Sequence, residues 1–383
     1  PLVPGILIVA ALTVVAGFLL GDPMLWLQRA LVMVVAASPC ALAISVPVTA
    51  VASIGAASRR GILIKGGAAL EALGRVRTIA LDKTGTLTRN QPAVIDVATI
   101  DPFSRTQVLE WAAALEVRSE HPLAKAILAA TDHLRAADDV AAEVGAGLTG
   151  TLDGRTLRLG RPGWIDAGPL AADVARMQRA GATAVLVEVD GLLVGAVAVR
   201  DELRPEAAEV VARLRSHGYT VAMLTGDNRA TAHALAVEAG IDEVYADLRP
   251  EDKSAIIGRL RDAGRATAMV GDGVNDAPAL AAADLGVAMG AMGTDVAIET
   301  ADVALMGDDL RLLPHAFDHA RRTRRIMLQN VAASIALISI LIPLAVFGIL
   351  GLAAVVLVHE IAEVFVIANG VRAGRTTHLP TLT

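Results

Sequence analysis

Acidic residues follow several short apolar segments in the middle of the chain. The heptad DKTGTLT (residues 82–88) begins directly after the apolar run that ends at Leu81. A carboxylate at the end of a strand, followed by a turn with glycine, can face a phosphate whose oxygens are bound by backbone N–H groups. Further polar groups stand in similar positions downstream, at Thr225, Gly226, Asp227, Lys253, Asp272, Asn275 and Asp276. Together they offer a nucleophilic carboxylate, Mg²⁺-binding carboxylates and a lysine, as phosphoryl transfer requires.

Alternating strands and helices must bring these residues together. Strands are predicted at Thr78–Asp82, Tyr219–Thr225, Ala266–Val270 and Asp284–Ala288. Helices are predicted between and beside them, at Pro205–Ser216, Arg229–Ala239, Glu251–Arg261 and Asp276–Ala283. This alternation is typical of a doubly wound, Rossmann-type α/β domain, whose sites lie at the carboxyl ends of the strands.

Residues 92–199 have a different pattern and interrupt the α/β segment. Asp153-Gly154 and Asp190-Gly191, each flanked by β-prone residues, predict two hairpins. Helices are predicted before them, near Thr106–Leu115 and Leu123–Arg135. We therefore expect an α+β domain inserted into the α/β domain.

The motifs DKTGTLT, TGD (225–227) and GDGVNDAP (271–278), in this order, resemble those of the P-type ATPases. These ion pumps pass through an aspartyl-phosphate, and the resemblance covers essentially the whole chain. It implies a haloacid-dehalogenase-like phosphorylation domain in which Asp82 becomes phosphorylated. It implies an Mg²⁺ site served by Asp82, Thr84, Asp272 and Asp276. It also implies that the phosphoryl and nucleotide groups are bound by Lys83, Thr225, Gly226, Asp227, Lys253 and Asn275.

Thr84 distinguishes the chain from the soluble phosphatases that resemble it. Those enzymes carry a second aspartate two residues after the nucleophile, which acts as a general acid–base. A threonine cannot shuttle that proton, so we expect a longer-lived phosphoenzyme, which suits a pump.

The inserted domain resembles the nucleotide-binding domain of heavy-metal pumps. SEHP (119–122) resembles their His-Pro motif, in which the histidine orients ATP. Gly145-Ala146-Gly147 matches their GxG, where missing side chains let a ligand approach the backbone. Gly160-Arg161 departs from the usual Gly-Asn, so no nucleotide contact is assigned to Arg161. The resemblance implies ATP contacts at Glu116, His121, Gly145 and Gly147.

The composition indicates a membrane protein. Hydrophobic residues make up 54% and charged residues 19% of the chain, which is too apolar for an ordinary soluble enzyme. A transmembrane helix needs roughly 20 apolar residues. Basic residues beside the predicted spans place the insert and the C-terminus in the cytoplasm, and the net charge of −6 argues against a nucleic-acid partner. The four predicted spans are Leu2–Leu20, Leu25–Ala52, Ile326–Val346 and Gly348–Ile367.

Ser38-Pro39-Cys40 interrupts the second predicted span. Proline has no N–H, so we expect the carbonyl of Val35 to lose its helical partner. Unpaired backbone at membrane depth is tolerated only beside protein or a polar cavity. A packed cysteine in a kinked helix remains the alternative interpretation.

Ionisable residues in the fourth span favour a metal site. His359 and Glu363 share a helical face, with Glu360 adjacent, and such groups are expensive in a membrane. With Cys40 they form a mixed S/N/O set suited to a divalent first-row transition metal. The Ser-Pro-Cys motif resembles that of a heavy-metal subgroup linked to cobalt, and also to zinc, iron or nickel. That subgroup usually has His-Glu-Gly-Gly-Thr where this chain has HEIAE, so Glu363 can take the threonine's place. The predicted ligands of the transported ion are Ser38, Cys40, His359, Glu360 and Glu363.

The expected organisation has five parts. Residues 1–58 form two transmembrane helices, residues 66–91 with 200–320 the phosphorylation domain, residues 92–199 the nucleotide-binding domain, residues 321–371 two further transmembrane helices and residues 372–383 a cytoplasmic tail. No Thr-Gly-Glu loop of an actuator domain occurs, so the chain is interpreted as the C-terminal portion of a longer pump. The expected activity is ATP-driven export of a divalent metal, cobalt first and also zinc, iron, nickel or cadmium, across the plasma (inner) membrane. A potassium-pump catalytic subunit and a membrane-tethered phosphatase remain alternatives.

Overall fold

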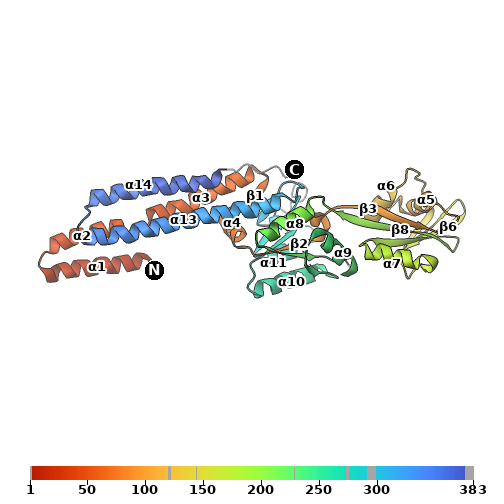
Figure 1. The fold of residues 1–383 in the computed structure, drawn as a ribbon, viewed down its shortest axis with the longest axis horizontal. Coiled ribbons are helices and arrows are strands. Elements are labelled where there is room, and N and C mark those ends of the chain that lie inside the picture. The colour runs from red at the N-terminus through yellow and green to blue at the C-terminus, as the bar shows by residue number, and fades with distance from the viewer. Residues whose placement is uncertain are drawn as a thin grey trace. The chain divides into compact units, whose positions relative to one another are not determined.

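The computed structural model describes residues 2–119, 122–143, 145–227, 229–272, 276–290 and 299–375. The chain divides into two compact units, one formed by Pro1–Arg75 with His315–Thr383 and the other by Val76–Pro314. The first unit is mainly helical, and the second contains two large groups of strands (Figure 1). Two residues of the expected nucleotide site, His121 and Asn275, lie outside the described residues.

Long apolar helices dominate the first unit. Within the described part of the chain, three stretches are long and apolar enough to cross a membrane: Pro23–Ser58, Leu312–Val346 and Leu352–Gly374. The first predicted span forms a shorter apolar helix by the same measure, over Pro4–Leu20. The elements of the unit are α1 (Leu2–Leu20), α2 (Pro23–Ala36), α3 (Cys40–Ser58), β1 (Ile62–Ile64), α4 (Gly66–Arg75), α13 (Leu312–Val346), α14 (Leu352–Val371) and η3 (Arg372–Gly374).

Residues 37–39 divide the second predicted span into two helices. Helix α2 ends at Ala36 and α3 begins at Cys40, with Pro39 as the residue before it. Proline is tolerated there because an N–H at the start of a helix has no intrahelical acceptor. The carbonyl of Val35 loses its helical partner, as expected, because residue 39 is a proline, but the N–H of Ser38 donates to it instead at 3.1 Å. The chain thus turns rather than leaving that carbonyl unpaired.

Polar side chains join the helices of this unit. Ser53 Oγ on α3 lies 2.8 Å from both Thr323 Oγ1 and His319 Nε2 on α13. Asn330 Nδ2 on α13 donates to the carbonyl of Val366 on α14 at 3.1 Å. Unpaired polar groups are costly in an apolar medium, so these pairs favour one register of α3, α13 and α14 over others.

The first sheet of the second unit is parallel, which confirms the doubly wound α/β prediction. Its strands pair in the order β13-β12-β11-β2-β9-β10. The chain runs from β2 outward to β9 and β10, and then returns to β11 on the other side of β2. Strand β2 therefore stands where the order reverses, which is the position of ligand crevices in such sheets. The strands are β2 (Thr78–Asp82), β9 (Thr220–Leu224), β10 (Glu243–Tyr245), β11 (Thr267–Gly271), β12 (Leu285–Ala288) and β13 (Val303–Leu305).

Helices connect these strands and pack on the sheet. Their apolar residues include Ile256, Ile257 and Leu260 of the helix after β10, which pack with Ala80, Leu224 and Met269 of the central strands. The helices are α8 (Ala207–Ser216), α9 (Arg229–Ala239), α10 (Pro250–Asp262) and α11 (Ala277–Ala282).

The second sheet is antiparallel and has the order β3-β8-β7-β6-β5-β4. Both predicted hairpins form, with Asp153-Gly154 between β5 and β6 and Asp190-Gly191 between β7 and β8; all four turn residues have positive φ. The sheet's strands are β3 (Thr88–Thr99), β4 (Asp138–Glu143), β5 (Gly147–Leu152), β6 (Arg155–Gly160), β7 (Thr183–Val189) and β8 (Leu192–Leu203).

Helices α5 (Arg105–Glu116), α6 (Pro122–Ala129) and α7 (Ala171–Arg179), with the short η2 (Gly168–Leu170), belong to the same part of the chain. The helix expected over Leu123–Arg135 ends early, at Ala129. The Thr131 hydroxyl accepts a hydrogen bond from the N–H of His133, and such local bonds compete with helical ones.

Candidate active site

Asp82 is the last residue of β2 and lies between two other strand ends. Strand β11, which ends at Gly271, pairs with β2 on one side, and β9, which ends at Leu224, pairs with it on the other. Asp272 and Thr225 follow those two strands directly. The parallel register therefore brings the three sequence motifs to one edge of the sheet, as their order along the chain predicted.

Lys253 bridges two of the carboxylates. Its Nζ lies 2.6 Å from Asp82 Oδ1 and 2.6 Å from Asp276 Oδ1. All three residues are buried, with 4% of Asp82, 1% of Asp276 and 9% of Lys253 exposed. Buried charges are stable only when they are paired, so the position of Lys253 on α10 is as important to the site as that of Asp82.

The carboxylates carry more negative charge than Lys253 neutralises. The pKa of Asp82 is raised to about 7, first by burial and then by the nearby charges of Asp276 and Asp272, against the opposing effect of Lys253. Burial likewise raises the pKa of Asp276, although Lys253 acts against it. The negative charge of the carboxylates is therefore only partly compensated in this site, and a bound cation would compensate it further.

The turn after Asp82 is held close to Asp272. Gly85 has a φ of +73°, and a Cβ built on it would lie 3.2 Å from Asp272 Cβ and Oδ2. A larger residue would be strained and would press on that carboxylate. The hydroxyl of Thr86, which is buried, has no hydrogen-bond partner among the described residues.

A second lysine links the DKTGTLT and TGD motifs. Lys83 Nζ lies 2.8 Å from Asp227 Oδ2, and the N–H of Asp227 donates to Thr225 Oγ1 at 3.1 Å. A Cβ on Gly226 would lie 3.1 Å from the carbonyl oxygen of Leu248, so this turn has little room for a side chain. Lys83, Thr225 and Asp227 are thus linked to one another beside the paired ends of β2 and β9.

The expected Mg²⁺ ligands are compatible with a hard cation in their chemistry. Asp82 and Asp272 supply carboxylate oxygens, which Mg²⁺ prefers, and Asp272 is close enough to raise the pKa of Asp82. In the described part of the chain, no three His, Cys, Asp or Glu side chains are grouped to hold a metal. Lys253 instead contacts both Asp82 and Asp276.

The inserted domain contains a separate cavity of about 470 Å³. It is lined by Glu116, Gly145 and Gly147, which the sequence assigned to ATP, and also by Arg161. Gly147 has a further physical reason to be glycine, because a Cβ there would lie 2.1 Å from the carbonyl oxygen of Leu159. Close pairing of β5 with β6 therefore requires this glycine whether or not a ligand is bound.

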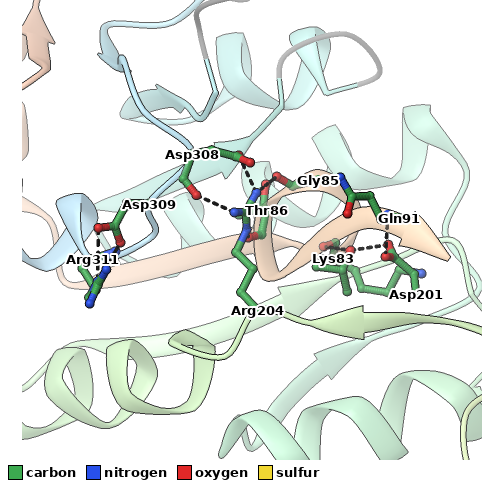
Figure 2. A network of polar contacts seen from close by, with 10 residues as sticks. Lys83, Gly85, Thr86, Gln91, Asp201, Arg204, Asp308, Asp309 and Arg311 are labelled. Carbon is green, nitrogen blue, oxygen red and sulfur yellow. Dashed lines mark hydrogen bonds and ion pairs between the residues drawn. The ribbon is translucent and has the colours of Figure 1, made fainter. Parts of the chain in front are cut away.

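Asp201 is a structural residue of this region that sequence reasoning missed. Its carboxylate accepts hydrogen bonds from the hydroxyl of Thr88 and, at 3.0 Å, from the N–H of Gln91 (Figure 2). These bonds fasten β3 to β8, the two strands by which the chain enters and leaves the second sheet. The indication available in the sequence was that Asp201 is an acidic residue within a run of β-prone residues.

The intramembrane residues are brought together only in part. Ser38 Oγ lies 3.0 Å from Cys40 Sγ, and His359 Nε2 donates to the carbonyl of Ala36, the last residue of α2, at 3.0 Å. His359 and Glu363 are half-buried, whereas Glu360 is exposed. The described residues therefore place His359 beside the helix break but do not assemble the full predicted ligand set.

Residues 76–284 match the family model of the haloacid dehalogenase-like hydrolases. The chain belongs to this family. The match begins before β2 and ends before β12, so it includes the inserted domain as well as the site around Asp82.

Relatives of this hydrolase are cation pumps. It is 71% identical over 375 residues to a probable cation-transporting ATPase G of Mycobacterium tuberculosis, covering 98% of this chain and 48% of the relative. It is 43% identical over 357 residues to a manganese-exporting P-type ATPase of Mycobacterium bovis, covering 90% of this chain and 50% of the relative. The chain thus spans about half the length of the curated relatives it matches.

A solved structure has the same fold. The crystal structure of a zinc-transporting PIB-type ATPase in the E2.Pi state superposes with a TM-score of 0.88 and 39% sequence identity. The match covers 97% of this chain and 62% of that one. The expected P-type ATPase architecture is therefore confirmed for the helices and both domains of the hydrolase.

The raised pKa of Asp82 predicts a pH-dependent gain in stability for Asp82→Asn. Because the carboxyl has a pKa of about 7 in the folded state and 3.8 ordinarily, its stabilising contribution is complete below about pH 4 and is lost as the pH rises through about 7. The variant avoids this loss, which is at most about 1.4 kcal/mol per pKa unit. Thermal unfolding should show Asp82→Asn to be more stable than the wild type near pH 8 and equally stable near pH 4.

The exposed Asp262 at the end of α10 offers a matched control. Asp262→Asn should not reproduce the pH-dependent difference. Equal stability of Asp82→Asn and the wild type at both pH values would contradict the raised pKa.

Proposed function

We propose that the chain forms the catalytic domains and the metal-binding helices of a P-type ATPase that exports a divalent transition metal. The observation that carries the proposal is the buried Asp82–Lys253–Asp276 cluster at the point where the strand order of the sheet reverses. A carboxylate nucleophile in this position, with a lysine 2.6 Å away, is suited to accept a phosphoryl group.

In the proposed step an oxygen of Asp82 attacks the γ-phosphorus of ATP. A bond forms between that oxygen and phosphorus, the bond to the β,γ-bridging oxygen breaks, and ADP leaves with the electron pair. Lys253 neutralises charge that develops on the phosphoryl oxygens, while Lys83 and Thr225 contact the group from the β9 side. Thr84 supplies no general base, so the aspartyl-phosphate persists until a water from elsewhere is activated.

Mg²⁺ would be held by Asp82 and Asp272, with Thr84 and Asp276 beside them, and would neutralise charge on the transferred phosphate. The surplus of carboxylates supports this assignment, as does the contact of the Gly85 turn with Asp272. Glu116, His121, Gly145 and Gly147 would bind ATP in the inserted domain, and Asn275 would contact the phosphate. The cavity of about 470 Å³ supports three of these contacts, those of Glu116 and the two glycines.

The transported ion would bind where α2 gives way to α3. The Ser38–Cys40 contact and the bond from His359 to Ala36 place a thiol and an imidazole on either side of this break. Softer donors of this kind favour a transition metal over K⁺. The Ser-Pro-Cys motif favours cobalt, whereas relatives named for manganese and zinc make these ions the first competitors. Export would take place across the plasma membrane, with the two domains in the cytoplasm.

Phosphorylation by ATP distinguishes the pump from a tethered phosphatase. The full-length protein that contains this chain should incorporate label from [γ-³²P]ATP when Mg²⁺ and the transported metal are present. Asp82→Asn should abolish the label, because no other carboxylate occupies its position. Asp262→Asn should keep the label. Release of phosphate from a small phosphomonoester without a stable phosphoenzyme would instead support the phosphatase.

Metal dependence tests the membrane site. Labelling of the wild type should rise with Co²⁺, Zn²⁺ or Mn²⁺ and not with K⁺. Cys40→Ala and His359→Ala should each reduce binding of the stimulating metal by about 10-fold or more, since removal of one ligand from a small set costs at least that much. Ser339→Ala is a suitable control, because its hydroxyl only bonds the carbonyl of Ile335 in its own helix.

Equilibrium dialysis of the purified full-length protein measures this binding directly. Unchanged stoichiometry in both ligand variants would contradict the proposed site. Stimulation by K⁺ alone would favour the potassium-pump alternative.

A further inference from the structure

Arg204 contacts three consecutive carbonyls of the turn that follows Asp82. Its Nη2 donates to the carbonyl of Gly85 at 3.2 Å, its Nε to that of Thr86 at 2.8 Å, and its backbone N–H to that of Leu87 at 2.9 Å. Arg204 itself follows directly after β8, far from this turn in the sequence. Figure 2 shows the guanidinium against the turn.

The contact is buried, which makes it energetically significant. Arg204 is 4% exposed. A buried carbonyl without a donor costs about 1–3 kcal/mol, and the planar guanidinium can serve several acceptors at once because it presents five N–H groups. A lysine at this position would offer one ammonium group and could not donate hydrogen bonds to the same set of carbonyls.

The hydrogen bonds from Arg204 to the carbonyls also fix the directions of the N–H groups of the turn. A trans peptide is planar, so its N–H points opposite to its C=O. The bonds to the carbonyls of Gly85 and Thr86 therefore set the directions of the next N–H groups, those of Thr86 and Leu87. Gly85 lies between two constraints, with Arg204 on its carbonyl and the carboxylate of Asp272 beside its Cα.

The same guanidinium reaches the segment that leads into α13. Nη2 lies 2.7 Å from Asp308 Oδ1, and Nη1 donates to the carbonyl of Asp308. Asp308 stands between β13 and α13 in the sequence, and its side chain is 77% exposed. One buried group thus binds both the turn beside the nucleophile and the residues just before a membrane helix.

We infer that Arg204 is a positioning residue for phosphoryl transfer, which holds the Gly85–Thr86 turn against Asp272 and ties it to Asp308. The inference rests on the proposed phosphorylation of Asp82. Arg204 acts through the turn and contacts no reacting atom.

The test uses the full-length protein with Arg204→Lys and Arg204→Gln. Phosphorylation of Asp82 by [γ-³²P]ATP should slow by about 100-fold, the order expected when reacting groups are displaced by about 1 Å. The affinity for ATP should stay within about 2-fold, because the cavity that would bind the nucleotide contains no atom of Arg204. Hydrogen exchange of the Lys83–Thr88 amides should accelerate in both variants, even without ATP.

Arg311→Gln is the matched control. This arginine lies in the same segment as Asp308 but pairs with its neighbour Asp309, with Nε 2.9 Å from Oδ1. Its loss should leave the phosphorylation rate and the exchange of the turn unchanged. Asp308→Ala removes one acceptor of Arg204 at an exposed position, so it should fold and slow phosphorylation by a smaller factor, about 3- to 10-fold.

The outcomes separate the two proposals. Wild-type rates and exchange in Arg204→Lys, or parallel losses of ATP affinity and rate, would overturn the inference. Should both Arg204 variants fail to fold, a wild-type rate in Asp308→Ala would overturn it. Absence of label from the wild type itself would refute the proposed function, whereas the exchange measurement would still report on the contact between Arg204 and the turn.

Discussion

The contact of Lys253 with Asp82 and Asp276 is the interaction on which the site at the end of β2 depends. Each distance is 2.6 Å, and all three groups are buried. Without the lysine, two neighbouring carboxylates would lose the hydration of water with little compensation, and their pKa values would rise still further. With it, the carboxylate of Asp82 remains buried at the end of β2 beside a positive charge, where it can bind a cation or contact a phosphoryl group.

The parallel sheet brings the residues of this site together. Strands β11, β2 and β9 end side by side, so residues separated by more than a hundred positions in the sequence become neighbours. The antiparallel sheet places the cavity lined by Glu116 and the two glycines on a different framework. The chain passes between the two frameworks at β3 and β8, where Asp201 bonds Thr88 and Gln91 of β3 and Arg204 bonds the carbonyls of the turn before β3.

Polar groups of the helical unit also need partners, because that unit is mainly apolar. Its helix break satisfies its own backbone, since Ser38 donates to the carbonyl of Val35 and His359 to that of Ala36. The carbonyls of Val35 and Ala36 at this break therefore both have donors, as an apolar setting requires. The pairs Ser53–Thr323 and Asn330–Val366 extend this pattern toward the other end of the unit.

The sequence by itself determined the α/β order, both hairpins, the apolar helices and the identity of the central acids, because periodicity, turn chemistry and motif order are local properties. It could not place the end of the helix at Ala129, where a threonine hydroxyl competes with the helix. Nor could it show that Val35 keeps a partner, that Gly147 is required by strand pairing, or that Arg204 grips the turn after Asp82. These features were decided only by the tertiary structure, since each depends on which distant backbone atoms come within hydrogen-bonding or van der Waals distance once the strands and helices have packed.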